Sequence, residues 1–347
     1  MIIGKHTISQ KHKPFIVAEM SGNHNQSLDR AIKIVEAAAE SGAHMLKLQT
    51  YTADTLTINS KISDFFIADE KSLWKGKTLY DLYKEAYTPW DWHEKIINRA
   101  NELGMLCFSS PFDETAVDFL EKLNVPAYKI ASFENIHLPL IKKVAQTGKP
   151  VIISTGLATE KEIKEAVDTL KVGGCNQFAL LKTTSTYPAS PKDSNILTIP
   201  ELRKNFNCEV GLSDHTMGIG VALAAISHGA TIIEKHFTLD RNDGGVDSSF
   251  SIEPQEMKVL VKESTQAWQA LGKISYGPTE SEKSGIKFRR SIYIVEDIDL
   301  GEKITKEKIR IIRPGKGLAP KYYDEILGQT VNQKLTKGTA LTWDMLK

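Results

Sequence analysis

Two lysines interrupt apolar segments of this 347-residue chain, and they are the first residues that suggest chemistry. Lys47 lies within His44–Thr50 and Lys129 within Ala127–Ser132. A lone lysine in a strand is usually a solvated edge residue, but a charge inside an apolar core requires a partner. Two such lysines indicate an anionic ligand, with a structural ion pair as the alternative.

Two histidines stand at the ends of further apolar segments. His215 follows Glu209–Ser213, and His236 ends Thr231–His236. Two imidazoles suit Mn, Fe, Co or Zn, with water and substrate in the remaining coordination positions. From position alone, two histidines that are satisfied by ordinary hydrogen bonds are an equally good interpretation.

Carboxylates occur beside these groups. Glu234 and Asp214 are candidates to orient the imidazoles or to bind the metal. Asp247 follows the last apolar segment closely enough to reach the same rim, and Glu19 ends the first one. The sequence therefore predicts one polar site assembled from the ends of several strands.

The elements that must position these residues alternate between short apolar runs and helix-period segments, as in Leu28–Ser41 and Pro254–Leu271. About eight such units predict a closed (β/α)8 barrel, whose chemistry lies at the carboxyl ends of its strands. On strand His44–Thr50, Lys47 and Gln49 are two apart and therefore share a face. The expected strands are Phe15–Met20, His44–Thr50, Met105–Ser110, Ala127–Ser132, Val151–Ser154, Phe178–Thr183, Glu209–Ser213 and Thr231–His236.

A doubly wound sheet is the competing architecture, but no GxGxxG loop follows Phe15–Met20. Residues 1–272 are therefore expected to form the barrel, and the Gly, Ser and Lys-rich stretch 273–286 a linker. Residues 287–347 begin with the strand Ser291–Val295 and are rich in turns, as expected of a small second domain.

The composition excludes several classes of function. The chain carries 44 Lys and Arg against 43 Asp and Glu, so it lacks the positive field that nucleic acids or membrane surfaces require. No apolar run is long enough to cross a membrane, and the N-terminus offers no signal segment. Three widely spaced cysteines predict free thiols in a reducing compartment. We expect a cytoplasmic protein.

Taken together, these segments resemble the sialic acid synthase family, which condenses phosphoenolpyruvate with an amino sugar. The resemblance covers nearly the whole chain in order, and it implies a TIM barrel followed by an antifreeze-like SAF domain. The matching stretches are Ala18–Asn25, Lys47–Thr50, Ser110–Asp113, Tyr128–Ser132, Ile153–Gly156, Gly211–His215, Glu234–Thr238, Arg289–Ser291 and Arg313–Gly315.

The resemblance implies a role for each residue at a matching position. Glu19 and Asp247 would position water or move protons. A divalent cation (Mn, Co or Mg) on His215 and His236 would act as a Lewis acid on the sugar aldehyde. The phosphoenolpyruvate set would be Lys47, Lys129, Ser132, Ser154 and Ser185, and the sugar-orienting set Gln49, Glu134, Tyr187 and Arg313.

Arg313 carries a further implication, because it resembles the arginine that the SAF domain delivers to the active site of the partner subunit. That implies a domain-swapped homodimer. Without the resemblance, Arg313 would be an ordinary surface arginine.

Within the family, the chain most resembles the pseudaminic acid synthases, in Leu79–Trp90, Gly244–Ser251 and Gly317–Tyr323. Ser248 stands where the neuraminate and legionaminate branches usually have His, which is expected to remove a polar group from the acceptor pocket. The implied acceptor is 2,4-diacetamido-2,4,6-trideoxy-altrose. The alternatives are N-acetylneuraminate or legionaminate synthesis, and a catalytically dead barrel that only binds a sugar.

Overall fold

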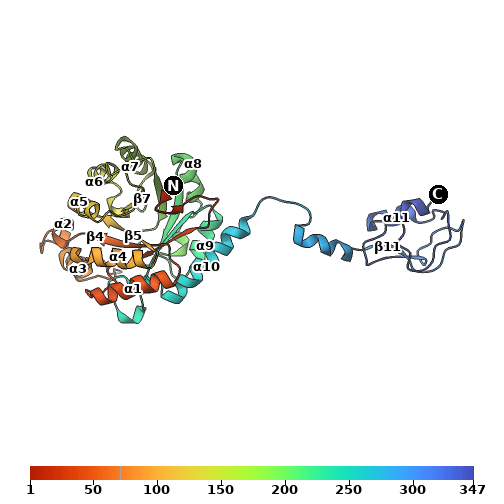
Figure 1. Ribbon diagram of the computed structural model, residues 1–347, viewed down its shortest axis with the longest axis horizontal. Coiled ribbons are helices and arrows are strands. Elements are labelled where there is room, and N and C mark those ends of the chain that lie inside the picture. The colour runs from red at the N-terminus through yellow and green to blue at the C-terminus, as the bar shows by residue number, and fades with distance from the viewer. Residues whose placement is uncertain (71) are drawn as a thin grey trace. The chain divides into compact units, whose positions relative to one another are not determined.

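The computed structural model describes residues 1–70 and 72–347 and divides them into two compact units, Met1–Gly272 and Lys273–Lys347. In the described part of the first unit, eight parallel strands close into a barrel, with β10 paired to β3 (Figure 1). The expected (β/α)8 barrel is confirmed. Its strands are β3 (Phe15–Glu19), β4 (Met45–Thr50), β5 (Leu106–Pro111), β6 (Tyr128–Ile130), β7 (Val151–Ser154), β8 (Phe178–Thr183), β9 (Glu209–Asp214) and β10 (Ile232–His236).

Helices follow the strands and cover the outside of the barrel (Figure 1). They begin where the sequence offers a cap: at α7, the Thr159 side chain accepts from Glu162 N while the Glu162 carboxylate accepts from Thr159 N. The helices are α1 (Leu28–Glu40), α4 (His93–Glu102), α5 (Glu114–Lys122), α6 (Leu138–Ala145), α7 (Glu160–Val172), α8 (Thr198–Phe206), α9 (Gly220–Ser227) and α10 (Pro254–Leu271).

Side chains alternate between the barrel interior and the layer beneath the helices, because successive strand residues point to opposite faces. In β4, Met45 packs inside the barrel while Leu46 and Leu48 pack against the helices. Lys47 and Gln49 therefore point inward with Met45, above the apolar floor. The same alternation in β10 sends Glu234 and His236 inward.

An N-terminal hairpin that the sequence analysis did not expect closes the other end of the barrel. Strands β1 (Ile2–Ile3) and β2 (His6–Thr7) pair antiparallel. Ile3 and Ile8 are buried in the apolar cluster inside the barrel, beside Phe15 and Val17. Burial of these residues keeps water out of the barrel from below, so the polar cavity opens at the carboxyl ends of the strands.

A long insertion separates β4 from α4. It contains α2 (Ala53–Leu56), a short 3-10 turn (Ser63–Phe65) and α3 (Leu79–Ala86). An antiparallel bridge joins Phe66 to Thr78. The insertion lies at the carboxyl end of β4, and therefore on the side of the barrel where the site is expected.

The second unit contains a two-stranded antiparallel sheet of β11 (Ser291–Ile294) and β12 (Ile309–Ile312), and the short helix α11 (Tyr323–Ile326). It has an apolar core of its own around Ile292, Ile294 and Ile309. The stretch 273–286, expected as a linker, is not irregular throughout. Glu280–Phe288 is a 3-10 helix, which begins there because Thr279 and Glu282 cap each other's backbone.

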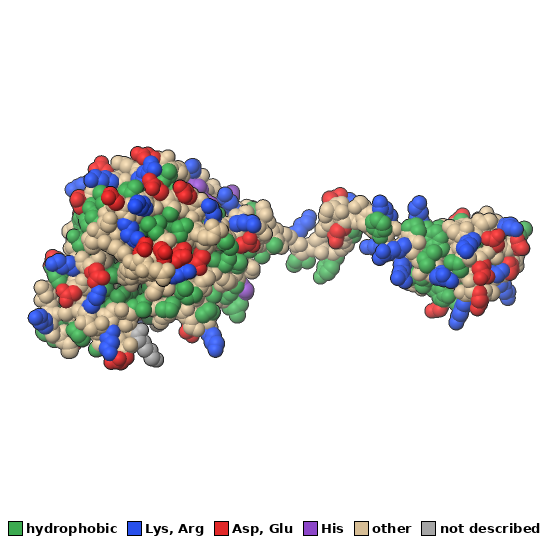
Figure 2. All heavy atoms as spheres, turned by 90° about the horizontal axis from the view of Figure 1, so that it is seen from below, with side chains coloured by type: hydrophobic (Ala, Val, Ile, Leu, Met, Phe, Trp, Pro, Cys, Tyr) green, Lys and Arg blue, Asp and Glu red, His purple; other side chains and the backbone are tan. Residues whose placement is uncertain are grey.

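The surface agrees with the near-neutral composition. Acidic and basic side chains are interspersed over the face of the first unit seen in Figure 2. In the part of the chain that is described, no helix is both long and apolar enough to cross a bilayer.

Candidate active site

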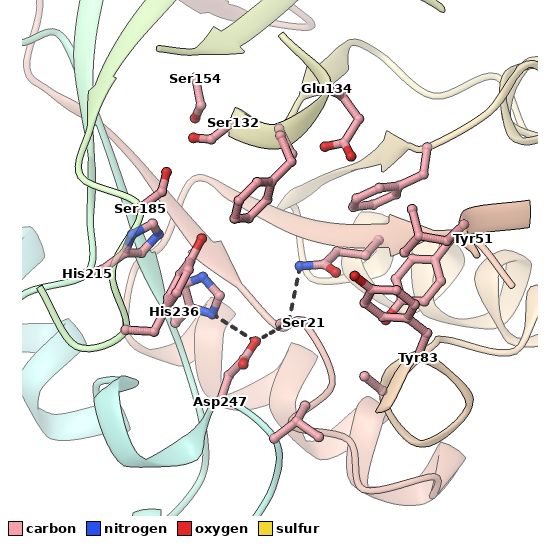
Figure 3. A pocket seen from close by; sticks show the side chains of 18 of the residues that line it. Ser21, Tyr51, Tyr83, Ser132, Glu134, Ser154, Ser185, His215, His236 and Asp247 are labelled. Atoms are coloured by element: carbon pink, nitrogen blue, oxygen red, sulfur yellow. Dashed lines mark hydrogen bonds and ion pairs between the residues drawn. The ribbon is translucent and has the colours of Figure 1, made fainter. Parts of the chain in front are cut away.

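A cavity of about 460 Å³ lies at the carboxyl ends of the barrel strands. The structure brings almost all of the residues singled out in the sequence to its wall (Figure 3). Glu19 is completely buried and lies below the cavity, in contact with residues that line it. The predicted residues that line the cavity are Lys47, Gln49, Lys129, Ser132, Glu134, Ser154, Ser185, Tyr187, His215, His236 and Asp247.

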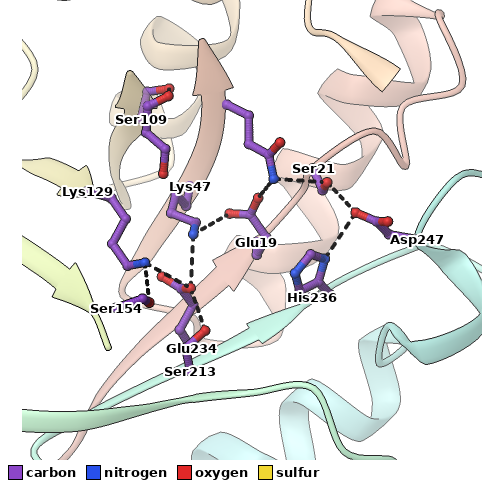
Figure 4. Close-up of polar contacts among 12 residues, drawn as sticks. Glu19, Ser21, Lys47, Ser109, Lys129, Ser154, Ser213, Glu234, His236 and Asp247 are labelled. Carbon is purple, nitrogen blue, oxygen red and sulfur yellow. Dashed lines mark hydrogen bonds and ion pairs between the residues drawn. The ribbon is translucent and has the colours of Figure 1, made fainter. Parts of the chain in front are cut away.

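The floor of the cavity is a buried charge network (Figure 4). Lys47 Nζ lies 2.9 Å from Glu234 Oε1 and 3.3 Å from Glu19 Oε2. Lys129 Nζ donates to Ser154 Oγ at 2.6 Å and lies 3.8 Å from Glu234 Oε1. Glu234 Oε1 contacts the two lysines and Ser213, and Glu234 Oε2 has no hydrogen-bond partner among the described residues. The suggestion that Glu234 orients an imidazole is therefore wrong.

Lys129 retains uncompensated positive charge. Burial lowers the pKa of Lys129 to about 8, and the attraction of Glu234 opposes this effect only in part. The two lysines hold the pKa of Glu234 at about 2, against the effect of its burial, so Glu234 is ionised. The two ammonium groups share Glu234, and Glu19, which also contacts Lys47, has a raised pKa, so this side of the cavity is suited to an anion.

Three serines converge above the lysines. A Cβ atom placed on Gly156 would lie 2.2 Å from Ser185 Oγ and 2.6 Å from Ser132 Oγ, so only glycine allows these hydroxyls to approach. Ser185 Oγ is buried and has no hydrogen-bond partner among the described residues. An unpartnered buried hydroxyl is costly unless a ligand completes it.

Asn135 holds the backbone of this loop in place. Its Nδ2 donates to Ser154 O at 3.2 Å and to Gly156 O at 2.9 Å, and its side chain is buried. The sequence analysis did not single out Asn135, because an asparagine after a strand is usually a turn residue.

The two histidines lie side by side with ring centroids 5.3 Å apart. His215 Nδ1 donates to Thr184 O at 2.8 Å, and burial lowers the pKa of His215 to about 3, so this imidazole is neutral. His236 Nδ1 lies 3.4 Å from Asp247 Oδ2. The hydrogen bond from Nδ1 of His215 leaves its Nε2 as the electron-pair donor, the arrangement that histidine ligands of metals adopt.

This donor set fits a divalent cation with open coordination positions. The imidazoles are the candidate ligands, and Asp247 would orient one of them; Ser21 in turn donates to Asp247. No group of three or more His, Cys, Asp or Glu arranged to hold a metal occurs among residues 1–70 and 72–347. Water and substrate would therefore have to supply the other ligands, as expected for a catalytic site.

Asp214 is not part of this site, contrary to the suggestion that it binds metal or orients an imidazole. It follows Ser213, which faces the cavity, so strand alternation turns Asp214 outward. There it forms a buried ion pair with Lys235, with Asp214 Oδ2 and Lys235 Nζ 2.8 Å apart.

The pKa values of two acidic side chains of the site are shifted in opposite directions. Burial raises the pKa of Glu19, although Lys47 partly opposes the effect. His236 and Ser21 hold the pKa of Asp247 below its usual value despite burial. Glu19 therefore holds a proton more readily than an ordinary glutamate, and Asp247 less readily than an ordinary aspartate.

The sequence analysis missed an apolar side of the cavity, opposite the histidines and serines. Tyr51 and Tyr83 lie across the cavity from His215 and Ser185 (Figure 3). Their ring centroids are 5.8 Å apart, and Tyr51 also packs on Phe112. The only available signal was the richness in aromatic residues of the segment between β4 and α4, which does not reveal where that segment folds.

Two other predicted positions lie elsewhere. Ser248 is buried but does not line the cavity, and its hydroxyl donates to Gly245 O at 3.2 Å. Its expected effect on acceptor polarity is therefore not a direct contact. Arg313 follows β12 in the second unit and is exposed, and basic side chains gather at one end of that unit (Figure 2).

Comparison with known proteins accounts for both units. The NeuB family profile matches residues 34–276, and the SAF domain profile matches residues 289–347. Pseudaminic acid synthase from Campylobacter jejuni is 42% identical over 95% of each chain. The Helicobacter pylori enzyme of the same name is 42% identical over 95% of this chain and 97% of its own.

A solved structure agrees. The N-acetylneuraminic acid synthetase of Leptospira borgpetersenii, determined in complex with citrate, superposes with a TM-score of 0.73 at 30% identity. The match covers 83% of this chain and 95% of that one. With a barrel of this arrangement followed by a SAF domain, the chain belongs to the NeuB family of sialic acid synthases.

Proposed function

We propose that this chain condenses phosphoenolpyruvate with 2,4-diacetamido-2,4,6-trideoxy-altrose to give pseudaminic acid and phosphate. One observation carries the proposal: a single cavity joins an anion-binding side to a pair of metal-competent imidazoles, in a chain 42% identical to pseudaminic acid synthases. N-acetylneuraminate or legionaminate synthesis is the alternative within the family.

The phosphoenolpyruvate would lie on the lysine and serine side. Lys47 and Lys129 would neutralise its carboxylate and phosphate, and Ser132, Ser154 and Ser185 would donate to phosphate oxygens. Burial of both ammonium groups strengthens this attraction, because little water is present to screen it.

The acceptor would present its open-chain aldehyde to the other side. His215 and His236 would hold the divalent cation, which when bound polarises the aldehyde oxygen and makes its carbon electrophilic. Gln49, Glu134 and Tyr187 would orient the rest of the sugar. Residues 1–272 would form the barrel, residues 273–286 the linker and residues 287–347 the SAF domain. In a domain-swapped homodimer, Arg313 of the partner subunit would add a guanidinium to the sugar site.

The proposed reaction forms one carbon–carbon bond and releases phosphate. C3 of phosphoenolpyruvate attacks the aldehyde carbon, and the cation that develops at C2 takes up water. Asp247, as the ionised carboxylate, would accept the water proton, and Glu19 would supply a proton to the oxygen of the former aldehyde. Phosphate leaves by cleavage of the bond between C2 and the bridging oxygen.

The proposed location is the cytoplasm. Cys107, Cys175 and Cys208 are free thiols, which persist in a reducing compartment. Phosphoenolpyruvate, the proposed co-substrate, is produced there by central metabolism.

The test is phosphate release from phosphoenolpyruvate with different acceptors. We expect release with the diacetamido-trideoxy-altrose and, from phosphoenolpyruvate labelled with ¹⁸O at the bridging position, phosphate that retains the label. Lys129→Ala serves as the inactive control. Preferential turnover of N-acetylmannosamine would instead support neuraminate synthesis, and no release with any sugar would support a binding protein on a dead barrel.

A further inference from the structure

The insertion between β4 and α4 forms an apolar wall of the cavity. We define this insertion wall by six of the side chains of α2, α3 and the loop between them that line the cavity: Leu56, Ile67, Trp74, Leu79, Leu82 and Tyr83. Tyr83 lies across the cavity from His215 (Figure 3), and the Trp74 ring, at the edge of the wall, lies 6.0 Å from that of Tyr187. One cavity therefore has two chemically different sides.

Two sets of hydrogen bonds hold the insertion, one in its middle and one at the end of α3. Trp74 Nε1 donates to Val246 O at 2.9 Å, and Val246 immediately precedes Asp247. At the end of α3, Gln26 Nε2 donates to Glu85 O at 2.9 Å and to Tyr87 O at 2.7 Å. These bonds fix the insertion in place, so its apolar side chains meet the substrate already positioned.

The hydrogen-bonding capacity of the wall is small. The Trp74 N–H is already used by Val246 O, and Tyr83 contributes one hydroxyl. Leu56, Ile67, Leu79 and Leu82 offer none. A sugar hydroxyl pressed against these side chains would lose its water without gaining a partner, whereas a methyl group would gain contact.

The orientation of the acceptor follows from the chemistry of its two ends. Its aldehyde must lie by the imidazoles and Asp247, so the carbon farthest from the aldehyde points away from them. Tyr83 of the insertion wall lies on that opposite side, whereas Trp74 packs beside Tyr187 at the edge of the wall. On the basis of the proposed function, we infer that the insertion wall selects the acceptor by its C6 methyl group and discriminates against a C6 hydroxyl.

The expected size of the effect is moderate. One group added to or removed from an apolar pocket changes kcat/KM by roughly 10- to 200-fold, and an apolar pocket rejects an added hydroxyl by about 100-fold at most. We therefore expect the enzyme to prefer the 6-deoxy acceptor over its otherwise identical 6-hydroxy counterpart by roughly 10- to 100-fold.

The experiment compares kcat/KM for these two acceptors in the full-length enzyme and in wall variants. Ile67→Asn and Leu79→Asn each place an amide in the wall and should reduce the preference for the 6-deoxy acceptor at least about fivefold, with KM for phosphoenolpyruvate unchanged. Ile58→Asn is the matched control, because Ile58 belongs to the same insertion but is 60% exposed and does not line the cavity. Ile67→Thr is the milder variant if the amide prevents folding.

The outcomes separate the inference from the proposed function. If the wild type turns over both altrose acceptors equally well, or if the wall variants behave as Ile58→Asn does, the inference is overturned while the proposed function stands. If neither altrose acceptor is turned over and N-acetylmannosamine is, the proposed function fails and the inference fails with it. A reduced preference in the wall variants alone supports the inference.

Discussion

Replacing Gly156 by alanine tests the serine cradle directly. The added Cβ would lie 2.2 Å from Ser185 Oγ and 2.6 Å from Ser132 Oγ, far inside van der Waals contact, so both hydroxyls must move. A hydrogen bond to a charged group contributes about 1.5–3 kcal/mol. Loss of one such bond to phosphate should raise KM for phosphoenolpyruvate roughly 10- to 150-fold, and loss of both more than about 100-fold.

The assay is phosphate release at saturating acceptor, with folding checked by circular dichroism and thermal melting. Gly220→Ala is the matched control, because among the described residues no atom outside the adjacent residues and its own helix backbone lies within 4 Å of a Cβ there. Alanine is also the better helix former. If Gly156→Ala fails to fold, Ser185→Ala removes one hydroxyl without a clash and should show the smaller effect. A folded Gly156→Ala enzyme with the wild-type KM for phosphoenolpyruvate would refute the cradle.

Three further predictions concern the metal, the dimer and pH. Exhaustive chelation should abolish phosphate release, Mn, Co or Mg should restore it, and His215→Ala should lower activity at least about 100-fold; undiminished activity of the chelated enzyme would contradict the metal assignment. Arg313→Ala should weaken acceptor binding. Mixing it with Lys129→Ala should restore activity, because one site of the heterodimer then has an intact barrel and an intact arginine. No recovery after verified subunit exchange would argue against the swapped arrangement. Burial raises the pKa of Glu134 to about 7. Above the usual carboxyl pKa, the folded state therefore binds more protons than the unfolded state. The stability that this protonation contributes is lost as the pH rises through 7. Between pH 5 and pH 8, the free energy of unfolding of Glu134→Gln in urea should therefore fall less than that of the wild type, by up to about 3 kcal/mol. Parallel pH profiles of the two proteins would show that Glu134 is not the source of this pH dependence.

The metal prediction concerns residues within the barrel, whereas the arginine prediction concerns a residue of the second unit. The imidazoles share one cavity, and their neighbouring strands β9 and β10 are paired in the barrel. Arg313 belongs to a separate compact unit, so the mixing experiment tests whether it acts on the barrel of a partner chain.

Much of the barrel could be predicted from local pattern. Short apolar runs alternating with capped, helix-period segments determine the element order, because hydrophobic periodicity and caps act over a few residues. Strand alternation, which is equally local, predicted that Lys47 and Gln49 share one face of their strand, and the structure confirms this prediction. The resemblance of motifs then identified the family, although it said nothing about which side chains touch.

The tertiary structure decided the partners of the charged groups. Glu234 and Asp214 stand beside the histidines in the chain, yet Glu234 binds the lysines and Asp214 binds Lys235. Closure of the barrel, which pairs β10 with β3, brings Glu234 close to Lys47 on β4. The contact between Asp214 and Lys235 follows from the register of the paired strands β9 and β10.

The sequence also did not predict the apolar side of the cavity or the N-terminal hairpin that closes the other end of the barrel. The segment between β4 and α4 carries neither a sustained helix period nor strand alternation, so its fold depends on what it packs against. Trp74 reaches Val246 across 172 positions of the chain, and Ile3 and Ile8 fill the barrel floor. Such contacts depend on long-range packing, and the local pattern of residues does not encode them.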